Sequence, residues 1–182
     1  MNEFERKCYD IFDKNIDNAI DVKDWDRLTE LFNGELDGEY KFVLDNFGGV
    51  YVKEGMRFKA IQKTPLATKD GMETFSFFSG VYGNDNIFKI QKLYLGQIPP
   101  NLLPIGCIDG GNLLCMDKYN KFIYIWIHDQ VGNNVYLASK NLHDFVMSFQ
   151  MGGNNVDKND LGVVGVKCSQ DFLKALRGLK NN

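Results

Sequence analysis

Residues 102–117, LLPIGCIDGGNLLCMD, carry the strongest structural signal in the chain. Two apolar runs flank the turn 109–112 (Asp-Gly-Gly-Asn), and glycine tolerates the positive φ angles that tight hairpin turns require. Six residues later comes a third run, 123–128 (IYIWIH). Its three isoleucines fall on one side of a strand and its other side chains on the opposite side, because successive side chains alternate faces. The segment predicts a sheet with one aliphatic face and one aromatic, partly polar face.

The size and composition of the chain suit one globular domain. It has 182 residues, of which 44% are apolar and 13% aromatic, which provides a core and argues against disorder. No apolar run approaches the ~18–20 residues that a membrane helix needs. The N-terminal sequence MNEFERKCYD lacks the apolar segment of a signal peptide. We therefore expect no membrane contact and a cytoplasmic location.

No combination of residues in the sequence predicts catalysis. The four cysteines are scattered without a CxxC pair, and only two histidines occur. Reduced, mostly buried thiols are the favoured interpretation over a zinc site. The glycines of the hairpin precede a strand and lack the Gly-Lys-Ser/Thr of a phosphate loop, and no GxSxG nucleophile elbow is present. We expect no catalytic residues, no metal and no cofactor.

Acidic residues are concentrated at the N-terminus. The first 39 residues carry twelve Asp and Glu against five Lys and Arg, a net charge of −7, whereas the remainder carries +4. A solvated helical face explains this distribution, and so does an acidic patch that steers a basic partner. Direct nucleic-acid binding is disfavoured, because phosphates require Lys and Arg. The residues expected in such a patch are Asp17, Asp21, Asp24, Asp26 and Glu30.

The order of predicted elements indicates an α+β domain with a mainly antiparallel sheet. Apolar spacing predicts helices at 4–16, 25–32, 37–47, 84–95 and 142–151. Strands are predicted at 50–52, 56–60, 74–78, in the hairpin 102–117, and at 122–128 and 134–138. Residues 152–165 are rich in Gly, Asn and Asp and read as a loop. A last helix is expected after Ser169.

Trp126 has two interpretations that the sequence leaves open. It can be buried beneath the C-terminal helix, which we favour, or it can stand in an open groove with Tyr124 and His128. Trp and Tyr are enriched where protein interfaces are strongest, because they bring large area at little rotamer cost. The face formed by Tyr124, Trp126, His128 and the Asp109 turn is therefore a candidate binding surface.

The ordered set of motifs resembles the SUKH superfamily, in particular its Smi/Knr-like branch of bacterial immunity proteins. Residues 38–49 (GEYKFVLDNFGG) look like the family's helix and its glycine stop, and 103–106 with 109–117 look like its central hairpin. Residues 123–129 resemble its next strand, and 137–149 its closing strand and helix. The resemblance implies one α+β domain over residues 1–151, with helices packed on a twisted sheet. Residues 152–182 are then an extension, a linker plus a helix that packs on the same domain.

Family members typically bind and neutralise a toxin encoded beside them, often a nuclease, and do not catalyse reactions. The resemblance thus implies an antitoxin that occludes a cognate protein toxin, as a monomer or weak homodimer. One alternative is a general interaction scaffold or regulatory module of the same superfamily. Another is a small-molecule-binding or enzymatic domain with a deep pocket near Cys107, Asp109 and His128.

Overall fold

The computed structural model describes residues 1–13, 19–34 and 36–152. Within them the chain forms helices α1 (Glu3–Ile11), α2 (Val22–Leu31), α3 (Gly38–Phe47), α4 (Ile87–Leu93) and α5 (Leu142–Met147). The strands are β1 (Met56–Arg57), β2 (Phe77–Phe78), β3 (Leu102–Ile108), β4 (Asn112–Asp117), β5 (Ile123–Trp126), β6 (Val135–Ser139) and β7 (Gln150–Met151). Asp17 and the helix expected after Ser169 lie outside the described residues. The compact unit Met1–Gly152 is described below by itself.

A five-stranded antiparallel sheet in the order β2-β3-β4-β5-β6 forms the centre of this unit. The predicted hairpin is confirmed: β3 and β4 pair along their lengths, with Leu102 opposite Asp117 and Ile108 opposite Asn112. Gly110 and Gly111 both have φ of 78° in the connecting turn. A side chain rarely adopts this left-handed conformation, so the glycine pair makes the tight reversal possible. The fold class is α+β, as the sequence predicts.

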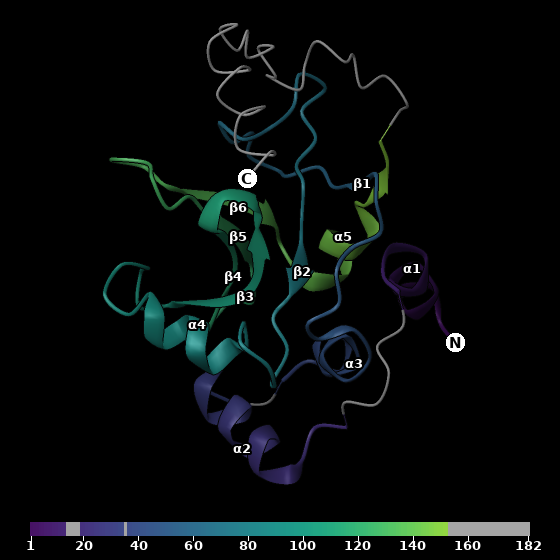
Figure 1. Ribbon diagram of the computed structural model, residues 1–182, viewed down its shortest axis with the longest axis vertical. Coiled ribbons are helices and arrows are strands. Elements are labelled where there is room, and N and C mark those ends of the chain that lie inside the picture. The colour runs from purple at the N-terminus through teal and green to yellow at the C-terminus, as the bar shows by residue number, and fades with distance from the viewer. Residues whose placement is uncertain (14–18, 35, 153–182) are drawn as a thin grey trace, which may run out of the picture. The chain divides into compact units, whose positions relative to one another are not determined.

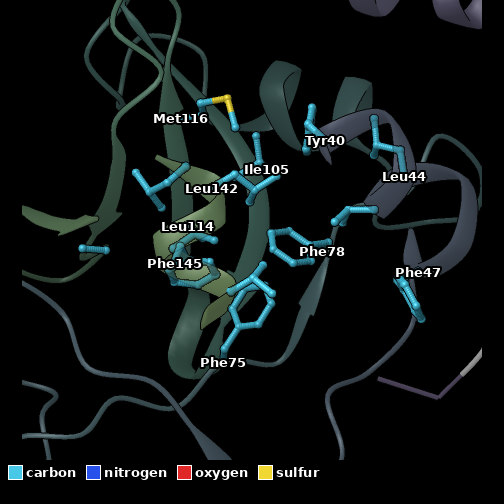
Figure 2. Packing of buried hydrophobic residues seen from close by; sticks show 14 of the residues in the cluster. Tyr40, Leu44, Phe47, Phe75, Phe78, Ile105, Leu114, Met116, Leu142 and Phe145 are labelled. Atoms are coloured by element: carbon cyan, nitrogen blue, oxygen red, sulfur yellow. The ribbon is translucent and has the colours of Figure 1, made fainter. Parts of the chain in front are cut away.

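Helices cover both faces of the sheet. The aliphatic residues of the central strands pack in one cluster with buried side chains of α1, α3 and α5. Figure 2 shows the part of this packing that involves α3 and α5. Among its members are Tyr40, Leu44, Phe78, Ile105, Leu114, Met116 and Phe145. Helix α4 lies on the opposite side of the sheet (Figure 1) and forms a second, smaller cluster there. The predicted aliphatic face of the sheet therefore packs in the larger cluster, and the predicted aromatic face packs in the smaller cluster.

The N-terminal helices differ from the prediction at their ends. Helix α1 ends at Ile11 because Phe12 is extended and pairs with Val52. The backbone N–H of Lys53 donates to Ile11 O at 2.8 Å. Helix α2 begins earlier than predicted, at Val22, because Asp21 is its N-cap; the Asp21 carboxylate accepts the N–H of Asp24 at 2.8 Å.

Most of the predicted strands between α3 and α4 are shorter than expected. Only Met56–Arg57 and Phe77–Phe78 form strands, and Val52 and Phe58 make isolated bridges. The helix predicted at 142–151 ends at Met147, because Gln150–Met151 pairs with β1. Helix α4 also stops earlier than predicted, and Gly96 with φ of 81° follows its last turn.

Loop segments occupy both edges of the main sheet. Along β6, the N–H groups of Ile61 and Gln62 donate to Ala138 O and Leu137 O at 3.0 and 2.8 Å. The Gln62 side chain in turn accepts the N–H of Leu137 at 2.7 Å. Beside β2, the Val52 N–H donates to Ser76 O at 2.8 Å. Because pairing groups at each edge are already used, the sheet offers little room for an added strand.

A close approach of two backbones fixes the end of α3 against the segment after β2. A Cβ atom built on Gly48 would lie 2.8 Å from Leu44 O and 3.0 Å from Gly80 Cα. A Cβ on Gly80 would lie 2.9 Å from Gly48 C. Both contacts involve backbone atoms, which cannot rotate away, so glycine is required at both positions by packing rather than by φ.

We predict that Gly48→Ala and Gly80→Ala each lower the free energy of unfolding by about 1–3 kcal/mol, because the added methyl group overpacks the contact. Gly38→Ala is the matched control: no atom lies within 4 Å of its built Cβ, and alanine is favoured over glycine in a helix. Urea unfolding followed by circular dichroism measures all three. Equal stability of the Gly48, Gly80 and Gly38 variants would contradict the close-packing account.

Glu73 is a buried carboxyl group, only 2% exposed. Its side chain accepts a hydrogen bond from Thr64 Oγ1 at 2.7 Å. Burial raises the pKa of Glu73, although the Thr64 hydrogen bonds and the nearby Lys63 oppose the shift. The folded protein therefore binds this proton more tightly than the unfolded chain, and stability contributed by Glu73 increases as the pH falls through its folded pKa.

We predict that the stability of the wild-type chain relative to Glu73→Gln is greater at pH 5 than at pH 7. The Gln variant keeps an acceptor for Thr64 but cannot titrate, so the difference between the two proteins isolates this group. Urea titrations at the two pH values measure it. A difference that stays constant, or that shrinks at pH 5, would show that burial does not raise the pKa.

Candidate partner-binding surfaces

Trp126 belongs to the core beneath α4. It is 2% exposed, and its ring meets Tyr94 edge-on at a centroid distance of 5.4 Å. Ile90, Leu102 and Leu113 surround it in the second cluster. Of the two interpretations that the sequence left open, the structure supports burial, but the covering helix is α4 rather than a C-terminal helix.

The remaining members of the aromatic face lie at the margin of α4. Tyr124 is half-buried in the same cluster, and the His128 side chain is 41% exposed. His128 Nδ1 lies 2.7 Å from the carboxylate of Asp129. Strand β5 ends at Trp126. His128 and Asp129 therefore lie outside the strand, where adjacent side chains need not point to opposite faces, and they pair with each other. The accessible part of this predicted surface is thus the segment after β5, not the sheet itself.

Hydrogen bonds hold the hairpin tip beside His128. The Asn112 side chain donates to Asp109 O at 2.6 Å and accepts the backbone N–H of His128 at 3.0 Å. The Asp109 carboxylate accepts a hydrogen bond from Ser76 Oγ at 2.8 Å. Asp109 and His128 are therefore exposed groups at one corner of the domain. Asn112 of β4 ties the β3–β4 turn to the segment after β5 at this corner.

The acidic residues of α2 separate into two pairs. Asp21 caps the helix, and Asp24 accepts from Arg27 Nη1 at 2.7 Å, so both serve the helix itself. Asp26 and Glu30 are exposed, one turn apart, and make no ion pair with any residue in the described ranges. They border a shallow recess together with Thr29 and Asn33. Of the predicted acidic patch, these two carboxylates are available to a partner.

Helices α2 and α4 are neighbours in Figure 1, and a side-chain contact joins them. The Arg27 guanidinium lies over the Phe88 ring, 3.8 Å from its centroid, a favourable cation–π geometry. Because Arg27 also pairs with Asp24, it links α2 to the first turn of α4. We use the name α2–α4 surface for the exposed residues Asp26 and Glu30 of α2 together with Leu93 and Leu95 at the end of α4.

The pocket expected near Cys107, Asp109 and His128 does not coincide with any of four cavities that the described residues line. Those lie against α2, at the C-terminal end of α4, beside Gly49 and Tyr82, and beneath Phe32 and Tyr40. Burial raises the pKa of Cys107 to about 11. A thiol with such a pKa is protonated at neutral pH and a poor nucleophile, so packing is the better account of this cysteine.

Within residues 1–13, 19–34 and 36–152, no group of three or more His, Cys, Asp or Glu side chains is arranged to hold a metal ion. The helices in these ranges are also too short or too polar to cross a bilayer.

The leucines at the end of α4 were missed by the sequence analysis. Leu93 and Leu95 are 68% and 78% exposed, although the helix buries Ile87 and Ile90. The sequence does indicate their exposure. Both leucines fall outside the apolar stripe formed by Ile87, Ile90 and Tyr94, and an apolar residue outside the buried stripe of an amphipathic helix faces solvent.

The fold and these surfaces define an α+β domain whose accessible features are charged and apolar helical surfaces around a sheet with buried central strands. The chain matches the SMI1 / KNR4 family (SUKH-1) over residues 19–148. It belongs to this family, as its motifs suggest. A related sequence is "SPbeta prophage-derived uncharacterized protein YokK" of Bacillus subtilis (strain 168), 26% identical over 166 residues, covering 82% of this chain and 86% of that protein. Solved structures gave no significant match.

We predict that Trp126→Ala lowers the free energy of unfolding by about 3–5 kcal/mol, because truncating a buried aromatic leaves a cavity. Tyr119→Ala is the control, since Tyr119 is largely exposed and exposed positions change stability by only about 0.5 kcal/mol. Chemical unfolding measures both. A Trp126→Ala variant as stable as the wild type would place Trp126 outside the core.

Proposed function

We propose that this chain is an immunity protein that binds a cognate protein toxin and blocks it by occlusion. The observation that carries the proposal is membership of the SMI1 / KNR4 family (SUKH-1) across residues 19–148, a family that in general includes immunity proteins. We further propose that it acts in the cytoplasm, by binding alone, without a catalytic step of its own.

The charge of α2 supports a basic partner. Asp26 and Glu30 project from the exposed side of the helix. The recess beside them is also lined by Thr29, Asn33 and Arg27, and the Arg27 guanidinium is paired with Asp24. Nuclease active sites attract phosphates with basic side chains, so an acidic surface can occupy the same region. Complementary charge also accelerates encounter and favours the correct partner. A nuclease is therefore our proposed class of toxin.

A direct test is co-expression of the toxin domain encoded by the neighbouring gene, with and without this chain. The proposal predicts that cells survive only when the chain is present, and that the two purified proteins elute as one complex in gel filtration. Unchanged toxicity together with separate elution would reject the proposal. A general interaction scaffold would instead bind several proteins and have no dedicated neighbouring toxin.

We predict that Asp26→Lys and Glu30→Lys each slow association with the toxin and reduce the dependence of its rate on salt. Charge steering acts at long range and is screened by ions, so its loss appears in the association rate rather than in dissociation. Glu54→Lys is the control, an equal charge change at an exposed turn residue outside α2. Stopped-flow or surface-based kinetics at several salt concentrations measure the rates. If Glu54→Lys slows association as strongly as the α2 variants, net charge rather than the α2 patch steers the encounter.

A further inference from the structure

A groove opens at the C-terminal end of α4, next to the cluster that holds Trp126. It has a volume of about 470 Å³, within the range of sites that accommodate ligand groups. Its lining is mostly apolar and comes from the end of α4, the following turn, β3 and the turn after β4. It includes Tyr94, Leu95, Ile98, Pro99, Pro100 and Lys118. Tyr94 and Ile98 also pack against the second core cluster, so the hydrophobic core supports this part of the groove wall.

Exposed leucines extend the apolar area of this groove. Leu95 lines it and is 78% exposed, while Leu93, at the last turn of α4, is 68% exposed. Such side chains lose favourable burial by remaining in water, and exposed apolar side chains at the edge of a groove are typical of interaction sites. A small molecule held in the groove would leave Leu93 uncovered, whereas a protein segment lying along the end of α4 covers both leucines.

The charge around the groove is positive. Lys118 is the one cation among the lining residues, which include no acid, and α4 itself carries two lysines and no acid. The Lys118 ammonium makes no ion pair with any residue that the structure describes. It is therefore available for a carboxylate of a bound partner.

The turn that carries Lys118 is fixed by a buried carboxylate. Asp117 accepts the N–H groups of Tyr119 and Asn120 at 2.8 and 3.1 Å, and also accepts from the Asn101 side chain. Burial tends to raise the pKa of Asp117, but these hydrogen bonds outweigh it and hold the pKa below its usual value. The Lys118 backbone N–H donates to Asn101 O at 2.9 Å. Hydrogen bonds thus fix the backbone of the turn from which the Lys118 side chain lines the groove.

We propose that this groove is the apolar anchor site for the protein partner, and that it takes a segment in which one or two apolar side chains stand beside an Asp or Glu. The inference rests on the proposed function and deepens it. The acidic side of the α2–α4 surface steers a basic partner, while the α4 end supplies the buried contact that holds it. This division matches the general anatomy of interfaces, an apolar centre with a charged rim.

The test is the dissociation constant for the purified toxin domain of the neighbouring gene, measured by calorimetry. Leu95→Asp and Lys118→Glu are each expected to weaken binding by about tenfold or more, because both place a negative charge against the partner's acid and Leu95→Asp also removes apolar contact. Lys118→Arg is expected to keep nearly wild-type affinity, since it retains the cation.

Two matched controls carry the same chemical changes elsewhere. Val131→Asp lies in the β5–β6 connection, where Val131 is fully exposed, and Lys140→Glu lies just before α5; both are expected to bind within about twofold of wild type. Thermal melts confirm that the variants are folded, and Leu95→Gln serves if Leu95→Asp melts early. Wild-type affinity in the Leu95 and Lys118 variants would overturn the groove but leave the proposed function intact. Absence of binding by the wild-type chain would overturn both.

Discussion

Burial of the β3–β4 hairpin on both faces is the constraint on which the rest of the structure depends. Apart from the half-buried Cys107, every residue of the two strands is buried. One face packs under α1, α3 and α5, and the other under α4. The two central strands therefore leave no exposed face for a partner to contact. The features that remain accessible to a partner are on the helices and connections around them, namely α2, the end of α4 and the corner at Asp109 and His128.

The sequence predicted the parts of this arrangement that depend on local chemistry. Alternation in 123–128 separated the two faces correctly, and the glycines at 110 and 111 located the turn. What alternation could not show is which helix covers which face, since that depends on packing between segments distant in the chain. Trp126 illustrates the limit: its burial was the favoured interpretation, yet the covering residue is Tyr94 of the turn that ends α4. Gly48 is similar, because its neighbour Gly80 is known only from the fold.

The candidate surfaces also combine features that the local sequence predicts with features that only the fold reveals. Clustering of acids in the first 39 residues was readable from composition, but the structure assigns Asp21 and Asp24 to the helix itself and leaves Asp26 and Glu30 exposed. The α4 groove is formed by residues from 91 to 118, and only Leu93 and Leu95 gave a hint of it. The Arg27–Phe88 contact links α2 to α4, and we propose that the acidic residues of α2 attract the partner at long range while the apolar end of α4 is buried against it.

Hydrogen–deuterium exchange of the chain alone and in complex with the toxin that we propose as its partner tests the central claim most directly. That claim is that the molecule binds through the α2–α4 surface and not through its sheet. The account predicts that toxin binding slows exchange in 21–34 and 93–100, while 124–129 exchanges as in the free chain. Slowed exchange centred on 124–129, with 21–34 and 93–100 unchanged in the complex, would contradict it.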